Sequence, residues 1–155
     1  MITSVSVESA RADGVAELLQ LSNEFTLALY PAESCYLLDA SELDRAEVTV
    51  FVGRDEVGAA LGMAALVDKA DGTAELKRMF VRPEARGRGL AAGLLRAVEA
   101  QAAVAGIPLL RLETGPLQHA AIALYESRGY ERIPNFGEYV GDPHSVCYAK
   151  TLRAA

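Results

Sequence analysis

The sequence predicts an α/β domain in which helices pack on a β-sheet. Two observations predict this class: the hydrophobic period changes from helical to alternating near Glu47, and a strand, a glycine-studded loop and a long helix follow one another from Ala74 to Ala102. The 155 residues, 51% of them hydrophobic, suffice for one core and leave little room for another. We therefore expect a single domain over residues 1–155.

The N-terminal segment is predicted to form one strand and two helices. Valine alternates with serine over residues 4–7, as in a half-buried strand. Apolar residues then keep helical spacing from Val15 to Leu29, and Asp13 is expected to cap this helix. A second, short helix is expected after Asp39, because its carboxylate and Glu42 have the spacing of a capping box.

The middle of the chain predicts three antiparallel strands. Residues 47–52 alternate apolar with other side chains, and a polar turn at 54–56 leads into the apolar run 57–67, a hairpin pattern. Asp71 and Gly72 both tolerate the positive φ of tight turns, so a third strand is expected over 74–81.

The C-terminal half predicts alternating helices and strands. The expected elements are a helix over 90–102, a strand over 109–114, a helix over 120–128, and strands over 130–133 and 145–152. The full predicted order is β-α-α-β-β-β-α-β-α-β-β, and no internal repeat interrupts it.

Composition and charge argue against several classes of partner. The net charge of −6 would repel a nucleic-acid backbone, and no apolar run reaches the roughly 20 residues of a membrane-spanning helix. The N-terminus lacks the pattern of a secretory signal. Cys35 and Cys147 lack the close spacing of a redox pair or of zinc ligands. We therefore expect a cytoplasmic protein that binds neither nucleic acid nor membrane.

The stretch from Arg86 to Ala91 lies between a predicted strand and a long helix, where an anion can bind. Backbone N–H groups at a helix start are unpaired and lie at the positive end of the helix dipole. Gly87 and Gly89 place no side chain in the way, and Arg86 and Arg88 add positive charge. The stretch is neither a dinucleotide fingerprint nor a P-loop. The alternative is a tight turn with two solvated arginines.

These residues resemble a known motif. The run Arg86-Gly87-Arg88-Gly89-Leu90-Ala91 is similar to the Arg/Gln-x-x-Gly-x-Gly/Ala motif of the GCN5-related N-acetyltransferases, and the resemblance is strongest over 74–130. It implies a mixed, mostly antiparallel central sheet of about seven strands with splayed central strands, flanked by about four helices. It also implies acetyl-CoA as cosubstrate, with no metal.

The resemblance assigns the cofactor contacts residue by residue. The amides of Arg86, Gly87, Arg88, Gly89, Leu90 and Ala91 would hold the pyrophosphate, and the pantetheine arm would lie along Met79, Phe80 and Val81. Many relatives have an asparagine for the cofactor arm at the position of Gln118, so this longer amide is an imperfect match.

The resemblance also proposes catalytic residues. Glu75 lies eleven residues before Arg86, where some members keep a glutamate as general base; the alternative is an exposed charge at a strand end. Tyr125 matches the tyrosine of the Leu-Tyr-Glu-x-x-Gly-Phe/Tyr segment at 124–130, and its neutral phenol could protonate the departing thiolate. The alternative for Tyr125 is core packing.

The implied reaction is acetyl transfer to a primary amine of a small molecule or peptide, by direct attack in a ternary complex. The acceptor, the acyl chain preference and the oligomeric state, a homodimer included, stay open. Four aromatic residues either line an acceptor pocket or close the core: Tyr30, Tyr36, Phe136 and Tyr139. Two other functions also stay open: a non-catalytic acyl-CoA sensor, and an RNA-binding patch made of Arg82, Arg86 and Arg88.

Overall fold

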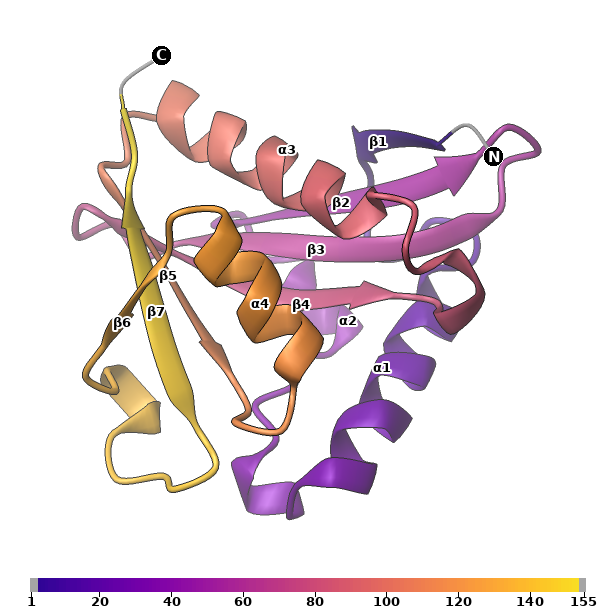
Figure 1. Cartoon of the computed structure of the whole chain (residues 1–155). Coiled ribbons are helices and arrows are strands. Elements are labelled where there is room, and N and C mark those ends of the chain that lie inside the picture. Colours follow the sequence, from indigo (N-terminus) through magenta and orange to yellow (C-terminus); the bar gives the residue numbers. More distant parts are fainter. Residues whose placement is uncertain (1–2, 154–155) are drawn as a thin grey trace.

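A seven-stranded sheet organises the computed structural model, which describes residues 3–153. The strands are β1 (Thr3–Val7), β2 (Val48–Asp55), β3 (Ala60–Asp68), β4 (Thr73–Val81), β5 (Leu109–Thr114), β6 (Glu131–Ile133) and β7 (Val146–Thr151). They lie in the order β1-β2-β3-β4-β5-β7-β6 (Figure 1), and within the described residues only the β4–β5 pair is parallel. The predicted mixed, mostly antiparallel sheet is confirmed.

Four α-helices flank the sheet in the described part of the chain, as predicted. They are α1 (Val15–Leu29), α2 (Ala40–Leu43), α3 (Leu90–Val104) and α4 (His119–Ser127), and three short 3-10 turns are η1 (Ala32–Ser34), η2 (Pro83–Ala85) and η3 (Gly137–Tyr139). In Figure 1, α3 and α4 cover one face of the sheet and α2 lies behind it.

The sheet therefore has a core on each face. On one face, Leu94, Leu95 and Val98 of α3 pack on strand residues such as Leu76 and Leu110. On the other, a second set of buried residues joins α1 and α2 to β2 and β3: Val15, Leu18, Leu43, Val50, Val52 and Met63. Alternation along each strand supplies both cores.

The helix starts follow the sequence expectations in one case and not in the other. The capping box of α2 is present: Glu42 N donates to Asp39 Oδ1 at 2.8 Å, and Asp39 N donates to Glu42 Oε1 at 3.1 Å. The expected cap at Asp13 is wrong, because α1 starts after Gly14, whose φ of 83° only glycine adopts readily.

Strands β4 and β5 pair over part of their lengths and then separate. Their register runs from Thr73–Leu109 to Leu76–Leu112, although β4 continues to Val81. Just past the paired part, Arg78 has a φ of 55° and the register with β3 shifts, as in a β-bulge. Among residues 3–153, no strand pairs with the β5-side edge of β4 after Leu76. The predicted splay is confirmed.

The buried side chain of Arg78 ties the bulge to α1. Its Nη1 donates to Asn23 Oδ1 at 2.7 Å and its Nη2 donates to the Leu19 carbonyl at 3.1 Å. Burial lowers the pKa of this guanidinium to about 10. These two hydrogen bonds therefore fix the position of the β4 bulge relative to α1, next to the point where β4 and β5 separate.

Across residues 3–153, none of the helices has both the length and the apolar character that crossing a bilayer requires. The single-domain prediction covers 1–155, and its first two and last two residues lie outside the described residues. The cytoplasmic location stays a prediction.

Candidate functional site

The loop before α3 exposes backbone at the start of a helix. Gly87 and Gly89 have φ angles of 79° and 81°, and a Cβ at either position would meet no atom within 4 Å in the described residues. Within that same part of the chain, no side chain caps α3. The amides of the first helical turn are thus open to an anion, since they have no acceptor within the helix.

The side chain of Arg86 packs against the wall of this loop, and its expected role as an amide and a positive charge for the pyrophosphate stays a prediction. Its guanidinium lies 5.3 Å from the ring centre of Phe25 and 5.7 Å from that of Phe80, and its Nε donates to the Val81 carbonyl at 3.1 Å. The side chain therefore joins α1 to the end of β4, which shapes the wall of the loop.

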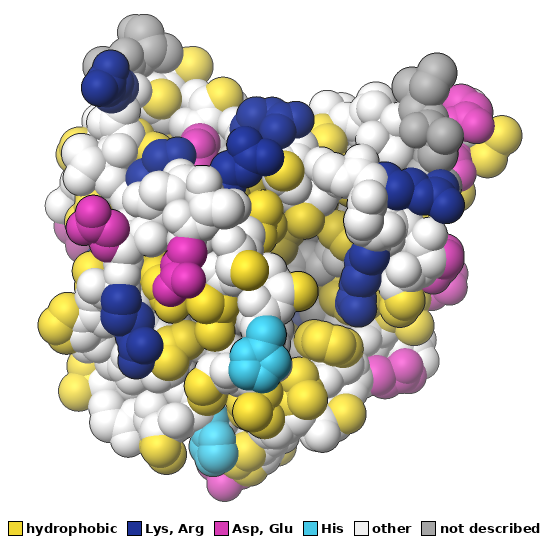
Figure 2. All heavy atoms as spheres, in the orientation of Figure 1, with side chains coloured by type: hydrophobic (Ala, Val, Ile, Leu, Met, Phe, Trp, Pro, Cys, Tyr) yellow, Lys and Arg dark blue, Asp and Glu magenta, His cyan; other side chains and the backbone are white. Residues whose placement is uncertain are grey.

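A groove of about 510 Å³ runs from this loop to α4, and we call it the cofactor groove. It is lined by α1 (Ser22, Phe25, Thr26), by the end of β4 (Met79, Phe80, Val81), by Ala85, Arg86, Gly87, Gly89, Leu90 and Ala91, and by residues 117–121, Leu124 and Tyr125. Figure 2 shows a hollow with hydrophobic side chains on this face, between the helices seen in Figure 1. Its size suits a small-molecule site.

The groove brings together most of the residues that the sequence singled out for the cofactor, together with Tyr125; Arg88 alone among them is not part of its lining. Gln118 lines it too, but its Oε1 accepts a hydrogen bond from Gly115 N at 2.9 Å and from Thr114 Oγ1 at 3.3 Å. Its oxygen therefore fixes the turn after β5, and its role as a cofactor contact stays a prediction.

Tyr125 differs from the other tyrosines of the chain. Five of the six hydroxyls have a hydrogen-bond partner: those of Tyr30, Tyr36, Tyr130, Tyr139 and Tyr148. In the described residues, the Tyr125 hydroxyl has none, although its ring is packed edge-on against Tyr130 at 5.8 Å. Burial, and the charge of Glu113, raise its pKa. Its phenol is thus neutral, and its side chain is among those that line the groove.

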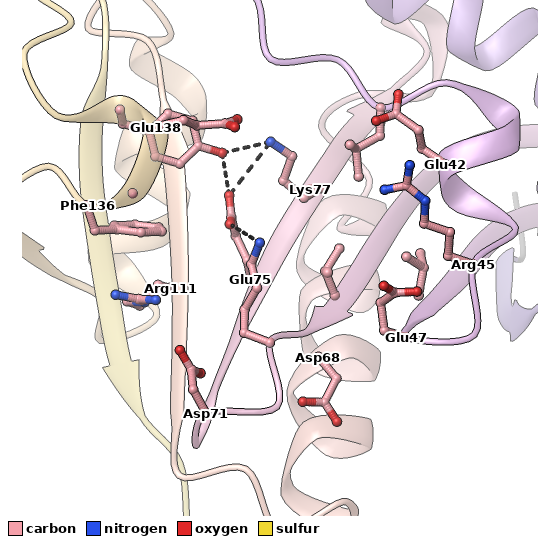
Figure 3. Close-up of a pocket in the computed structure, with 16 residues that line it drawn as sticks. Glu42, Arg45, Glu47, Asp68, Asp71, Glu75, Lys77, Arg111, Phe136 and Glu138 are labelled. Atoms are coloured by element: carbon pink, nitrogen blue, oxygen red, sulfur yellow. Dashed lines mark hydrogen bonds and ion pairs between the residues drawn. The ribbon is translucent and has the colours of Figure 1, made fainter.

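Glu75 lies away from the cofactor groove. It lines a second cavity on the sheet face opposite α3 (Figure 3), where it is 4% exposed. Tyr139 donates a hydrogen bond to its carboxylate, and the Nζ atoms of Lys69 and Lys77 lie 3.5 and 3.7 Å from it. Its expected catalytic role stays a prediction, and its carboxylate is already engaged by three groups.

Glu113 is a candidate that the sequence reasoning missed. It follows Leu112, the last β5 residue paired with β4, so it lies where the two strands separate. Burial raises the pKa of its carboxyl to about 7, while the hydrogen bond from Ser145 Oγ at 2.7 Å and the charge of Lys77 act against this. The signal in the sequence was alternation: Leu110 and Leu112 face the core, so Glu113 faces the other side of the sheet.

The two loops beside Glu113 carry the aromatic residues proposed for the acceptor. Tyr139 packs edge-on against Tyr36 at 4.7 Å and against Phe136 at 5.3 Å, and the Tyr36 hydroxyl donates to Asp142 at 2.6 Å. Tyr30 and Tyr139 are buried. Part of this cluster thus closes the core, as the packing alternative held, and Tyr36 and Phe136 are half-buried.

No group of three or more His, Cys, Asp or Glu residues in the described part could hold a metal ion. A reaction without metal stays a prediction.

Comparison with known proteins gives a consistent result. The model of the Acetyltransferase (GNAT) family matches residues 15–130. An IAA acetyltransferase from Azospirillum brasilense is 38% identical over 96% of this chain and 97% of its own length. A Klebsiella pneumoniae structure named for acyl-CoA N-acyltransferase activity superposes with a TM-score of 0.82 at 32% identity, over 97% of this chain and 98% of its own.

One further structure shares the fold and contains the cofactor. The PaiA N-acetyltransferase of Thermoplasma acidophilum, solved with coenzyme A, has a TM-score of 0.75 at 16% identity, over 97% of this chain and 99% of its own. Together with the motif, the splayed strands and the groove at the start of α3, these matches show that the chain belongs to the GNAT family of acetyl-CoA-dependent acyltransferases.

Proposed function

We propose that this enzyme transfers the acetyl group of acetyl-CoA to a primary amine of a small molecule or peptide, which attacks directly in a ternary complex. The observation that carries the proposal is the cofactor groove. Within residues 3–153, it joins a helix start without a side-chain cap, the part of β4 that does not pair with β5, and a Tyr125 hydroxyl without a hydrogen-bond partner. Acetyl-CoA would supply the thioester: the amine adds to its carbonyl carbon and forms the C–N bond, and the C–S bond then breaks to release coenzyme A.

The residues of the groove fit this cosubstrate. The open space at Gly87 and Gly89 lets phosphate oxygens reach the first amides of α3. The free edge of β4 at Met79, Phe80 and Val81 can hydrogen-bond to the amide groups of pantetheine as a strand would. A ligand bound in this way would reach the β4–β5 gap with its acyl end.

Glu113 is the group that we propose takes the proton of the amine. An ammonium must lose a proton before it can attack, and a base with a pKa near the working pH is suited to accept it. The carboxyl of Glu113 has a pKa of about 7 and lies at the gap. Glu75 is the alternative base suggested by the sequence, and its three partners argue for a structural role.

Tyr125 is the group that we propose donates a proton to the sulfur of the leaving group. Its hydroxyl has no partner in the described residues, so no hydrogen bond must break before it can act. Its raised pKa keeps it protonated at neutral pH. Glu113 and Tyr125 would thus act as base and acid on two sides of the same gap.

The experiment that tests this function is release of free thiol from acetyl-CoA in the presence of a panel of primary amines, with mass spectrometry of the product. We expect acetylated amine and coenzyme A in equal amounts. If calorimetry shows cofactor binding but no amine yields thiol or product, the sensor function gains and the transferase function is rejected. The name of the Azospirillum relative, an IAA acetyltransferase, makes small molecules the first part of the panel.

A further inference from the structure

A second cavity, of about 520 Å³, lies on the sheet face opposite α3, and we call it the Arg111 pocket. Its walls come from β4 and β5, from the ends of β2 and β3, and from the loop that carries η3 (Figure 3). Leu38, Val48, Val67 and Phe136 give it an apolar part. A cavity of this size with apolar walls and a few polar groups is typical of a small-molecule site.

Arg111 is the unusual group of this pocket. Its guanidinium stacks at 4.1 Å on the ring of Phe136, and its hydrogen bond to a protein group is that from Nη2 to Thr73 Oγ1 at 3.2 Å. Its Nε is buried, and no residue within 3–153 forms a hydrogen bond with it. In the described residues, no carboxylate lies within 4.0 Å of it. Most of its five donors are thus unused.

The neighbouring charges do not neutralise Arg111. The carboxylate of Glu75, its partner in the β4–β5 register, is engaged by Lys69, Lys77 and Tyr139. Asp71 feels the charge of Arg111, but its lowered pKa comes first from the Thr73 hydroxyl that donates to it. A guanidinium held flat on an aromatic ring with unused donors is suited to a carboxylate, which it can bind in a bidentate manner.

The rim of the pocket limits which anions can enter. Glu42, Glu47, Asp68 and Glu138 line it, and among the described lining residues the exposed cations are Arg45 and Lys69. Lys69 is already paired with Glu75 at 3.5 Å. The four rim acids would repel a phosphate ester or another multiply charged ligand more than a single carboxylate. Val48 and Val67 meanwhile offer contacts for an apolar group.

We propose that the Arg111 pocket binds a small carboxylic acid with an apolar body, whose carboxylate lies on Arg111 and whose body contacts Phe136 and the two valines. The carboxylate has two sources: the tail of the acceptor itself, or a separate ligand. Arg111 and Glu113 project from the same face of β5, about 7 Å apart along the strand, so one acceptor could contact both. The binding itself does not depend on the proposed reaction.

Titration of the full chain with phenylacetate, followed by amide NMR, tests the proposal, and phenylacetamide is the uncharged control. We expect saturable shifts around Gly137 and Lys69 with phenylacetate and at least tenfold weaker binding of the amide. Arg111→Gln should weaken phenylacetate binding at least tenfold. Arg111→Lys keeps the positive charge but lacks the paired N–H donors of the guanidinium, so it should weaken binding by a smaller factor. The control Arg132→Gln, on exposed β6 outside the pocket, should change it less than twofold.

The proposal is overturned if acid and amide bind equally, if no saturable shift appears at tens of millimolar, or if folded Arg111→Lys and Arg111→Gln bind phenylacetate like the wild type. Steady-state kinetics then separate the two sources. If phenylacetate competes with the amine acceptor, the pocket binds a carboxylate that is part of the acceptor. If phenylacetate inhibits without competing, the pocket binds a separate carboxylic acid. The titration remains readable even if no amine is acetylated, so the two proposals fail separately.

Discussion

The cofactor groove and the Arg111 pocket are built from different parts of the chain. The groove is made of backbone at the start of α3 and at the edge of β4, with mostly apolar side chains around it. The pocket is made largely of charged side chains from α2, β3, β4, β5 and the loops around them, and among these Glu75 is paired with Lys69 and Lys77. The two cavities are nevertheless of similar size, about 510 and 520 Å³.

A site built from backbone suits a ligand that never changes, such as the pyrophosphate of a cofactor. A site built from side chains suits a ligand that differs from one enzyme to another. Backbone amides can hold a pyrophosphate whatever the neighbouring side chains are, so a short glycine motif suffices. The Arg111 pocket instead depends on side chains that come together only when the chain folds. Tyr139 and Glu75, for example, are 64 residues apart in the sequence. Glu113 lies where β4 and β5 separate and lines neither cavity, and variants there test the comparison most strongly.

Replacing Glu113 by glutamine should have the largest effect. We expect kcat/KM at pH 7 to fall by about 100-fold, because general bases contribute factors of this order. In the wild type the rate should rise with pH through about 7, where the carboxyl ionises, and this limb should be lost in the variant. Stopped-assay rates from pH 5.5 to 9 measure both.

Glu75→Gln is the matched control, since it removes a carboxylate at a buried site outside the groove. We expect it to lower stability more than turnover. A pH limb that disappears in Glu75→Gln and persists in Glu113→Gln would return the base role to the residue that the sequence suggested.

Gly89→Val should weaken cofactor binding by tens-fold, because a side chain would stand where phosphate oxygens approach and charge-assisted hydrogen bonds of about 1.5–3 kcal/mol would be lost. Gly58→Val is the control: Gly58 has a φ of 88° and equally open surroundings, but lies in the turn between β2 and β3. Both variants carry similar backbone strain. Calorimetry should show weaker coenzyme A binding in Gly89→Val but not in Gly58→Val. If the two variants bind coenzyme A equally well, the start of α3 is not part of the cofactor site.

The sequence predicted the cofactor groove, which is built from backbone, better than the Arg111 pocket, which is built from side chains. Glycine spacing and the strand–loop–helix order located the groove, since both depend on local structure. The order of elements along the chain and the capping box at Asp39 were also correct. These features involve neighbours within a few residues, which is why a single sequence reveals them.

Long-range contacts explain what the sequence could not give. The bulge at Arg78 depends on contacts with α1, more than fifty residues earlier. A Cβ at Gly115, just after β5, would lie 2.0 Å from the Tyr30 hydroxyl, so the fold needs a glycine there for packing. The raised pKa of Glu113 likewise comes from burial, and the hydrogen bond that its carboxylate accepts comes from Ser145, 32 residues later in the chain.

Tyr125→Phe should have a smaller effect on the groove, a reduction of kcat by about tenfold with cofactor affinity within twofold. The hydroxyl has no protein partner in the described residues to lose, so stability should hardly change. Tyr148→Phe is the control, because its hydroxyl donates to Glu126 at 3.0 Å and its residue is absent from the groove lining. Equal kcat in wild type and Tyr125→Phe would assign protonation of the sulfur to solvent.

The smallest expected effect is on stability, and it has a defined sign. The pKa of Glu113 is raised from 4.5 to about 7 in the folded state, so the folded protein binds this proton more tightly than the unfolded chain. The stabilisation is therefore fully present below pH 4.5 and is lost as the pH rises through 7. Relative to wild type, Glu113→Gln should gain at least about 1 kcal/mol of unfolding free energy between pH 5 and pH 8.

Urea denaturation at both pH values measures this gain, and Glu138→Gln, at an exposed site, should show none. A pH-independent difference between Glu113→Gln and wild type would mean that the carboxyl titrates as an ordinary glutamate, which would leave the β4–β5 gap without its proposed base.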